Sequence, residues 1–69
     1  MDSKKIIKQL LLERNMTLPE LAEKLGYEQQ ALRNKINRDK YSLNDFVKFL
    51  DALDCDIKVI TRDTKKEFS

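Results

Sequence analysis

Gly26 is the single glycine of this 69-residue chain, and it stands between two short amphipathic segments. The first segment opens with Thr17, whose hydroxyl can cap a helix. Pro19 and Glu20 follow at positions where a missing N–H and a negative charge are favourable, and Glu20 completes a capping-box spacing with Thr17. Glycine commonly ends a helix because it enters the left-handed region without a steric clash. The pattern predicts two helices joined by a tight turn at Gly26.

The segment after this glycine has apolar side chains four residues apart and a polar remainder. Leu32 and Ile36 fall on one helical face, and amides and cations occupy the other faces. Leu21, Ala22 and Leu25 give the preceding segment an apolar face of its own. We therefore expect two crossing helices, the second of which exposes a row of polar side chains.

Two further amphipathic segments flank this pair. Residues 4–15 carry an apolar stripe that Leu12 widens, and residues 42–54 carry the most regular stripe in the chain after a capping-box-like start at Ser42. Phe49 lies off that stripe, so we expect a second molecule or the C-terminal segment to cover it. The stripe itself consists of Leu43, Phe46, Val47, Leu50 and Leu53.

After Cys55 the sequence becomes rich in β-branched residues that alternate, which predicts a strand over residues 57–62. A lone strand leaves its backbone hydrogen bonds unmet, and we find no second strand in the chain to pair with it. We expect antiparallel pairing with the same strand of another copy about a two-fold axis. An extended tail packed on its own domain and a continuation of the preceding helix are the alternatives. The expected dimer interface consists of Phe49, Ile57, Val59, Ile60 and Thr61.

The glycine-centred pair of helices resembles the helix-turn-helix of the Cro and lambda-repressor type, an XRE-like family of small phage and bacterial transcriptional regulators. The matching positions are Thr17, Glu20, Leu21, Ala22, Leu25, Gly26, Gln29, Gln30 and Leu32. The flanking helices extend the resemblance over residues 6–53. Leu18, Tyr27 and Glu28 depart from the family pattern, and Glu28 places an anion near DNA. Where the pattern would have an apolar residue at Lys35, we take Ile36 as the core residue.

The resemblance and the flanking segments together predict a mainly α fold, a compact bundle of four to five helices with a helix-turn-helix. A C-terminal β-strand is expected to pair across a homodimer. Residues 1–55 would form the DNA-binding domain, residues 56–63 the dimerisation strand and residues 64–69 a disordered tail.

The resemblance also implies that the helix from Glu28 to about Asn37 enters the major groove of DNA. Glutamine and asparagine carry a donor and an acceptor on one planar amide, which matches adenine N6 and N7. The expected contacts to base edges are Gln29, Gln30, Arg33 and Asn34. Arg33 and Lys35 could each reach either guanine or a phosphate. The expected contacts to phosphates are Thr17, Lys35, Arg38, Lys40, Tyr41 and Ser42.

Charge and composition limit the other possibilities. Residues 1–41 hold nine Lys and Arg against six Asp and Glu, so the cationic excess falls on the half with the expected DNA-binding helix. With no histidine and one cysteine, the chain lacks the usual zinc ligands and an intrachain disulfide. We expect no metal and no cofactor, and Cys55 to be a buried or partly buried thiol. The chain also lacks a glycine-rich phosphate loop and an evident base for Cys55, so we do not expect an enzyme.

The expected function is sequence-specific binding of double-stranded DNA by a homodimer on an inverted repeat, as a transcriptional repressor of phage, plasmid or bacterial origin. The two half-sites would lie about 34 Å apart, one helical turn of DNA. Regulation would come through concentration, a partner protein or competition for DNA. The alternative is an antitoxin-like protein-interaction module in which DNA binding is secondary. No apolar run is long enough to span a membrane, which predicts a cytoplasmic protein without a membrane partner.

Overall fold

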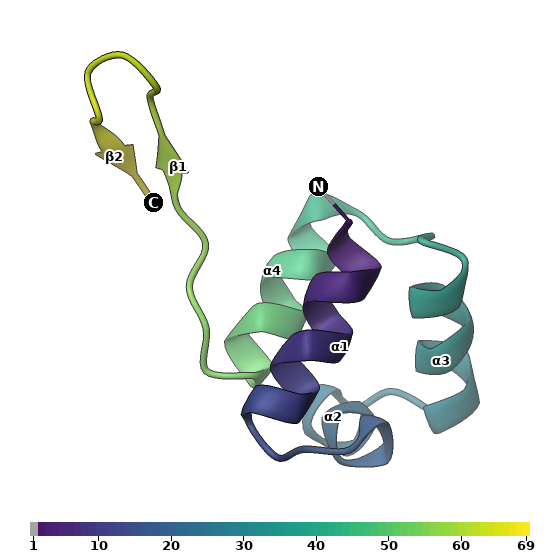
Figure 1. The fold of residues 1–69 in the computed structure, drawn as a ribbon. Coiled ribbons are helices and arrows are strands. Elements are labelled where there is room, and N and C mark those ends of the chain that lie inside the picture. The colour runs from purple at the N-terminus through teal and green to yellow at the C-terminus, as the bar shows by residue number, and fades with distance from the viewer. Residues whose placement is uncertain (1) are drawn as a thin grey trace.

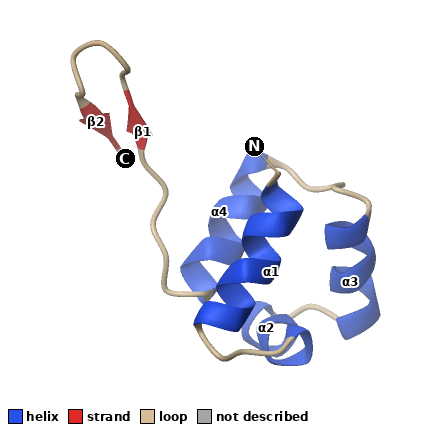
Figure 2. Ribbon diagram, viewed as in Figure 1, coloured by secondary structure: helices blue, strands red, loops and turns tan. Residues whose placement is uncertain are grey.

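The computed structural model describes residues 2–69, which form four helices followed by a small hairpin (Figure 1). The elements are α1 (Ser3–Glu13), α2 (Leu18–Leu25), α3 (Gln29–Asn37), α4 (Leu43–Ala52), β1 (Val59–Ile60) and β2 (Glu67–Phe68). The four helices gather in one body, and the two strands stand apart from it at the end of an extended segment (Figure 2). The mainly helical fold expected from the sequence is confirmed.

The helix starts are fixed by side chains that accept hydrogen bonds from the first backbone N–H groups. At α2, the Glu20 N–H donates to Thr17 Oγ1 over 3.3 Å and the Thr17 N–H donates to Glu20 Oε1 over 3.2 Å, which is the predicted capping box. Ser42 and Asp45 form the same arrangement at α4, and the Asp2 side chain accepts from the backbone at the start of α1. These contacts are local in sequence, so the starts of these helices do not depend on tertiary contacts.

Gly26 ends α2 in the left-handed region, with φ 73° and ψ 25°, as predicted. The backbone N–H of Tyr27 donates to the carbonyl of Ala22 over 2.8 Å and closes the end of the helix. The turn into α3 then occupies only residues 26–28. A turn this short requires a residue that tolerates positive φ at Gly26.

Gly26→Ala is expected to lower the free energy of unfolding by about 1 kcal/mol, the cost of a Cβ in the left-handed region. No atom lies within 4 Å of the position that this Cβ would take, so backbone strain is the whole cost. Urea denaturation followed by circular dichroism measures the change. Gly26→Asn is the matched control and should lose less, because asparagine tolerates this conformation. An alanine variant as stable as the wild type would contradict this account of the turn.

The core fills the space between the four helices. Its completely or almost completely buried side chains are Ile7, Leu21, Ala22, Leu32, Ile36, Phe46, Phe49, Leu50 and Leu53. Ile36 fills the second apolar position of α3, as expected. Lys35 lies beside the core instead, with Nζ 5.8 Å from the centroid of the Tyr27 ring. The Lys35 ammonium is therefore accommodated on an aromatic face.

α4 buries only part of the predicted stripe, namely Phe46, Leu50 and Leu53, and it buries Phe49 in addition. Phe49 is completely buried, and the Tyr27 and Tyr41 rings meet it edge-on. Leu43 and Val47, which belong to the predicted stripe, are 69% and 40% exposed. The expectation that a second molecule covers Phe49 is wrong, because two aromatic rings of the same chain cover it. Phe49 therefore belongs to the core of the domain and not to a dimer interface.

α1 buries a narrower face than predicted. Ile7 is completely buried, and Leu10 and Leu11 are partly buried against the core, but Leu12 is 82% exposed. Leu12 follows Ile7 by five residues, which is about 140° around a helix of 3.6 residues per turn. The prediction that Leu12 widens the buried stripe is wrong, because this rotation turns it away from the other helices.

The C-terminal segment forms a hairpin within one chain. β1 pairs antiparallel with β2, with Val59 opposite Phe68 and Ile60 opposite Glu67. Two predictions are therefore wrong: that the chain holds no second strand, and that residues 64–69 form a disordered tail. A two-residue strand in a polar segment has too short a pattern for alternation to reveal it. The hairpin leaves the other edge of β1 without a neighbouring strand among residues 2–69.

Candidate nucleic-acid interface

α3 exposes a pair of amide side chains on the side away from the core. Gln30 and Asn34 are one helical turn apart and both exposed, while Leu32 and Ile36 are buried on the opposite side. Gln30 Nε2 donates to Asn34 Oδ1 over 3.1 Å. This bond aligns the two amides along the helix and leaves the Gln30 carbonyl oxygen and the Asn34 amino group to meet groups outside the molecule.

The other two expected base contacts lie on the flanks of α3. Arg33 follows Leu32 by one residue, about 100° around the helix, and lines a groove that α3 shares with α1 and α2. Gln29 is exposed in the first turn of the helix. The structure therefore places Gln30 and Asn34 together on the outer face and sets Arg33 apart from them.

The N-terminus of α3 already carries an anion from its own chain. The Glu28 carboxylate accepts from the backbone N–H groups of Gln30 and Ala31, over 3.2 Å each. A helix N-terminus otherwise attracts phosphate, because its first N–H groups are unpaired and the helix dipole favours negative charge. Glu28 occupies that place, so an external anion near α3 would have to be bound by cationic side chains.

Two of the hydroxyls expected to contact phosphate are engaged in helix caps. Thr17 Oγ1 donates to Glu20 Oε1 over 2.9 Å besides accepting from the Glu20 backbone. Ser42 Oγ accepts from the Asp45 N–H over 3.1 Å. Each hydroxyl is thus held in a capping box together with a carboxylate of its own helix, Glu20 or Asp45.

Tyr41 is half-buried in the loop between α3 and α4. Its hydroxyl bonds to the Ser3 hydroxyl and donates to Asp39 Oδ1 over 3.2 Å. Burial is the main cause that raises the pKa of Tyr41, the Asp39 carboxylate raises it further, and the bond with Ser3 acts in the opposite direction. Tyr41 thus remains a neutral phenol that joins the loop to α1.

The remaining expected phosphate contacts are cations at the end of α3 and in the loop. Arg38 and Lys40 are exposed, and Lys35 is half-buried against Tyr27. Within residues 2–69 the one ion pair joins Lys58 to Glu67, at 3.4 Å and far from this loop along the chain. The cations around α3 are therefore not neutralised by a carboxylate of the described chain.

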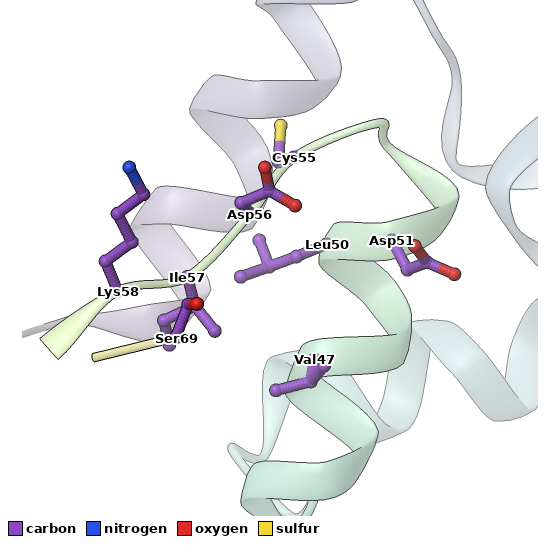
Figure 3. Close-up of a pocket in the computed structure, with 8 residues that line it drawn as sticks. All are labelled: Val47, Leu50, Asp51, Cys55, Asp56, Ile57, Lys58 and Ser69. Carbon is purple, nitrogen blue, oxygen red and sulfur yellow. The ribbon is translucent and has the colours of Figure 1, made fainter. Parts of the chain in front are cut away.

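A second hollow lies between α4 and the segment that follows it (Figure 3). Its lining residues are Val47, Leu50, Asp51, Cys55, Asp56, Ile57, Lys58 and Ser69. Ile57 is half-buried against the core, so this expected dimer residue packs within its own chain. Cys55 is half-buried, as predicted, and its Sγ donates to the Leu53 carbonyl over 3.3 Å. No cluster of three or more His, Cys, Asp or Glu suited to a metal occurs within residues 2–69.

The hairpin holds the other residues of the expected dimer interface. Val59 and Ile60 are 67% and 53% exposed, and Phe68 on β2 is 55% exposed. Thr61 is half-buried, and its hydroxyl bonds to Thr64 and accepts from the backbone of the hairpin turn. The apolar surface of the hairpin therefore comes from Val59, Ile60 and Phe68.

The fold is a small helical domain that presents one polar helix and carries an appended hairpin. Residues 2–57 match the family described as Domain of unknown function (DUF6471), and the chain belongs to this family. The match takes in all four helices and ends before β1. Comparisons with curated proteins and with solved structures gave no match. None of the helices within residues 2–69 has the length and apolar character needed to cross a membrane.

Proposed function

We propose that this protein binds double-stranded DNA in a sequence-specific manner, with α3 in the major groove. The observation that carries the proposal is the exposed pair of amides, Gln30 and Asn34. They are aligned on the outer face of α3, which packs against α2. An amide that approaches an adenine edge can accept from N6 and donate to N7 at once. Two such amides one turn apart can read neighbouring base pairs.

The charge around α3 supports the same proposal. Residues 28–41 hold four cations, Arg33, Lys35, Arg38 and Lys40, against two carboxylates. One of these carboxylates, Glu28, is bound to backbone N–H groups of α3, and the other, Asp39, accepts from the Tyr41 hydroxyl. Cations on both sides of a polar helix are the electrostatic footprint that a phosphate backbone requires.

The resemblance to Cro and lambda-repressor-type regulators adds a mode of action. A capped α2, a left-handed glycine and a short turn into α3 are the local features on which that motif depends. We therefore infer a cytoplasmic transcriptional repressor that acts as a homodimer on an inverted repeat. A domain of this size can block a promoter by occupying it, without a further catalytic or sensory unit.

The test of this function is in vitro selection of random duplex DNA by the wild-type protein. We expect an inverted repeat whose half-site centres lie about 34 Å apart, because a two-fold dimer places its two recognition helices one DNA turn apart. A parallel selection without protein controls for bias in the library. Recovery of salt-sensitive binding with no preferred sequence would contradict the proposal and would favour a protein-interaction module.

The hairpin supports the homodimer. A two-stranded hairpin is marginally stable alone in water, and this one exposes three apolar side chains at Val59, Ile60 and Phe68. The Thr61 N–H donates to the Lys66 carbonyl across the hairpin, over 3.0 Å. Because successive residues of a strand direct their N–H groups to opposite edges, the Ile60 N–H faces the uncovered edge of β1. Pairing of two β1 edges about a two-fold axis would give a four-stranded sheet.

Ile60→Pro is expected to give a monomer, because proline removes the N–H at the uncovered edge. Analytical ultracentrifugation measures the mass, and affinity for the selected repeat should fall at least about tenfold when the two half-sites are no longer bound by linked domains. Ile60→Thr keeps the N–H and the β-branch and is the matched control. An unchanged mass and affinity in Ile60→Pro would show that β1 does not form the dimer.

A further inference from the structure

We propose that the groove between α1, α2 and α3 binds a phosphate of the DNA backbone through Lys8 and Arg33. This inference rests on the proposed DNA binding by α3 and adds a second contact region beside it. It also assigns Arg33 to a phosphate, one of the two partners that the sequence left open for it, and a phosphate contact adds affinity but carries no sequence information.

The groove brings together two cations that are 25 positions apart in the chain. Its lining residues are Ile7, Lys8, Leu11, Leu18, Arg33, Ile36 and Asn37, around a volume of about 350 Å³. Four of these side chains are apolar, and no carboxylate lines the groove. Lys8 and Arg33 are both exposed, so their charged groups are open to a ligand from outside.

A third cation lies where α1 meets the end of α3. Lys4 Nζ donates to the Asn37 carbonyl over 3.4 Å and so links the start of α1 to the C-terminal end of α3. Asn37 also lines the groove. Lys4 and Lys8 are one turn apart on α1, so the positive charge continues along the side of α1 that borders the groove.

An anion fits this arrangement better than any other ligand class. Two cations border an apolar floor, and no carboxylate lines the groove to neutralise them, so the local potential favours an anion. A phosphate neutralises both, since its oxygens can accept two parallel bonds from a guanidinium and one from an ammonium. Glu28 already fills the N-terminus of α3, so these side chains are the cations available on this flank.

The position of Arg33 also indicates the backbone as the partner and not a base edge. Arg33 lies about 100° around the helix from Leu32 and about 100° from Asn34, between the buried face and the outer face. A helix in the major groove of DNA directs its outer face to the bases. Its flanks face the two sugar-phosphate backbones that form the walls of the major groove. In this orientation Arg33 and Lys8 face the backbone of one DNA strand, while Gln30 and Asn34 face the bases.

The test compares Lys8→Gln and Arg33→Gln with the wild type on duplex DNA, by fluorescence anisotropy between 50 and 200 mM salt. Each variant should make the slope of log affinity against log salt less negative by about 0.9, the value for one lost phosphate contact on B-DNA. The sequence recovered by in vitro selection should stay the same. Lys48→Gln removes an exposed charge from α4, outside the groove, and should leave the slope unchanged.

A neutral methylphosphonate placed at successive backbone positions gives a second readout. At one position it should weaken wild-type binding and have little further effect on Lys8→Gln. Slopes equal to the wild type, or a changed base preference in Arg33→Gln, would overturn the inference while specific binding stands. If the variants showed less negative salt slopes on random duplex but selection recovered no preferred sequence, the phosphate contact would be supported. The proposed sequence-specific binding would then be refuted. Absence of any duplex binding would refute both.

Discussion

Replacing Phe49 with alanine will lower the free energy of unfolding by about 3–5 kcal/mol, the usual cost of truncating a fully buried phenylalanine. Phe49 is completely buried, and its ring centroid lies 6.1 Å from that of Tyr27 and 5.4 Å from that of Tyr41, both edge-on. Alanine would lose the free energy of burying the ring and both aromatic contacts, and it would leave a cavity in the core. Since small domains have only about 5–15 kcal/mol to lose, much of the population should unfold on mild heating.

Thermal and urea denaturation followed by circular dichroism measure this change. Leu43→Ala is the matched control on the same helix, because Leu43 is also apolar but 69% exposed. Its effect should stay within about 0.5 kcal/mol. If Phe49→Ala kept the stability of the wild type and changed only the oligomeric mass, Phe49 would be an interface residue, as the helical pattern alone suggested.

The features that the sequence predicted correctly depend on neighbours within four residues. The capping box of Thr17 and Glu20 and the left-handed Gly26 formed as expected. Leu32 and Ile36 are buried together on α3, because side chains four apart share a helical face in any context. Local chemistry is sufficient to place the ends of α2 and α3 and the face that α3 buries.

The features that the sequence did not predict depend on contacts between distant residues. Tyr27 and Tyr41 come from two different turns, and their rings cover Phe49, which the pattern of α4 alone left outside the stripe. The second strand, Glu67–Phe68, becomes recognisable only through its pairing with Val59 and Ile60. The periodicity of one segment does not identify a pairing partner that lies seven or more residues away.

The residues of the candidate site also differ in whether local sequence or the tertiary fold brings them together. Gln30 and Asn34 lie one turn apart, so helical periodicity alone could place them on one exposed face. The groove of Lys8 and Arg33 unites α1 with α3 and needs the tertiary fold. The family match covers the helical body up to residue 57 and leaves out the hairpin. The helical surfaces that carry the proposed DNA contacts therefore lie within the family domain, and the proposed dimer contact lies outside it.

The second large effect is expected from the amide pair of α3. Gln30→Ala and Asn34→Ala should each weaken binding to the selected site by about 1–3 kcal/mol, or about 5- to 150-fold, the worth of one bidentate amide contact to a base. Each loss should appear as relaxed preference at one or two base pairs in a repeated selection. The double variant should retain only the salt-dependent binding that cations supply to any duplex.

The two losses should not add, because Gln30 Nε2 donates to Asn34 Oδ1 and either alanine also releases the other amide from its alignment. Fluorescence anisotropy at one fixed salt concentration, on the selected site and on a scrambled duplex, separates specific from general binding. Gln9→Ala removes an exposed amide from α1 and is the matched control. Gln30 and Asn34 are both exposed, so circular dichroism should show unchanged stability in all variants. Base preferences that survive in the double variant would mean that Gln29 or another surface reads the DNA.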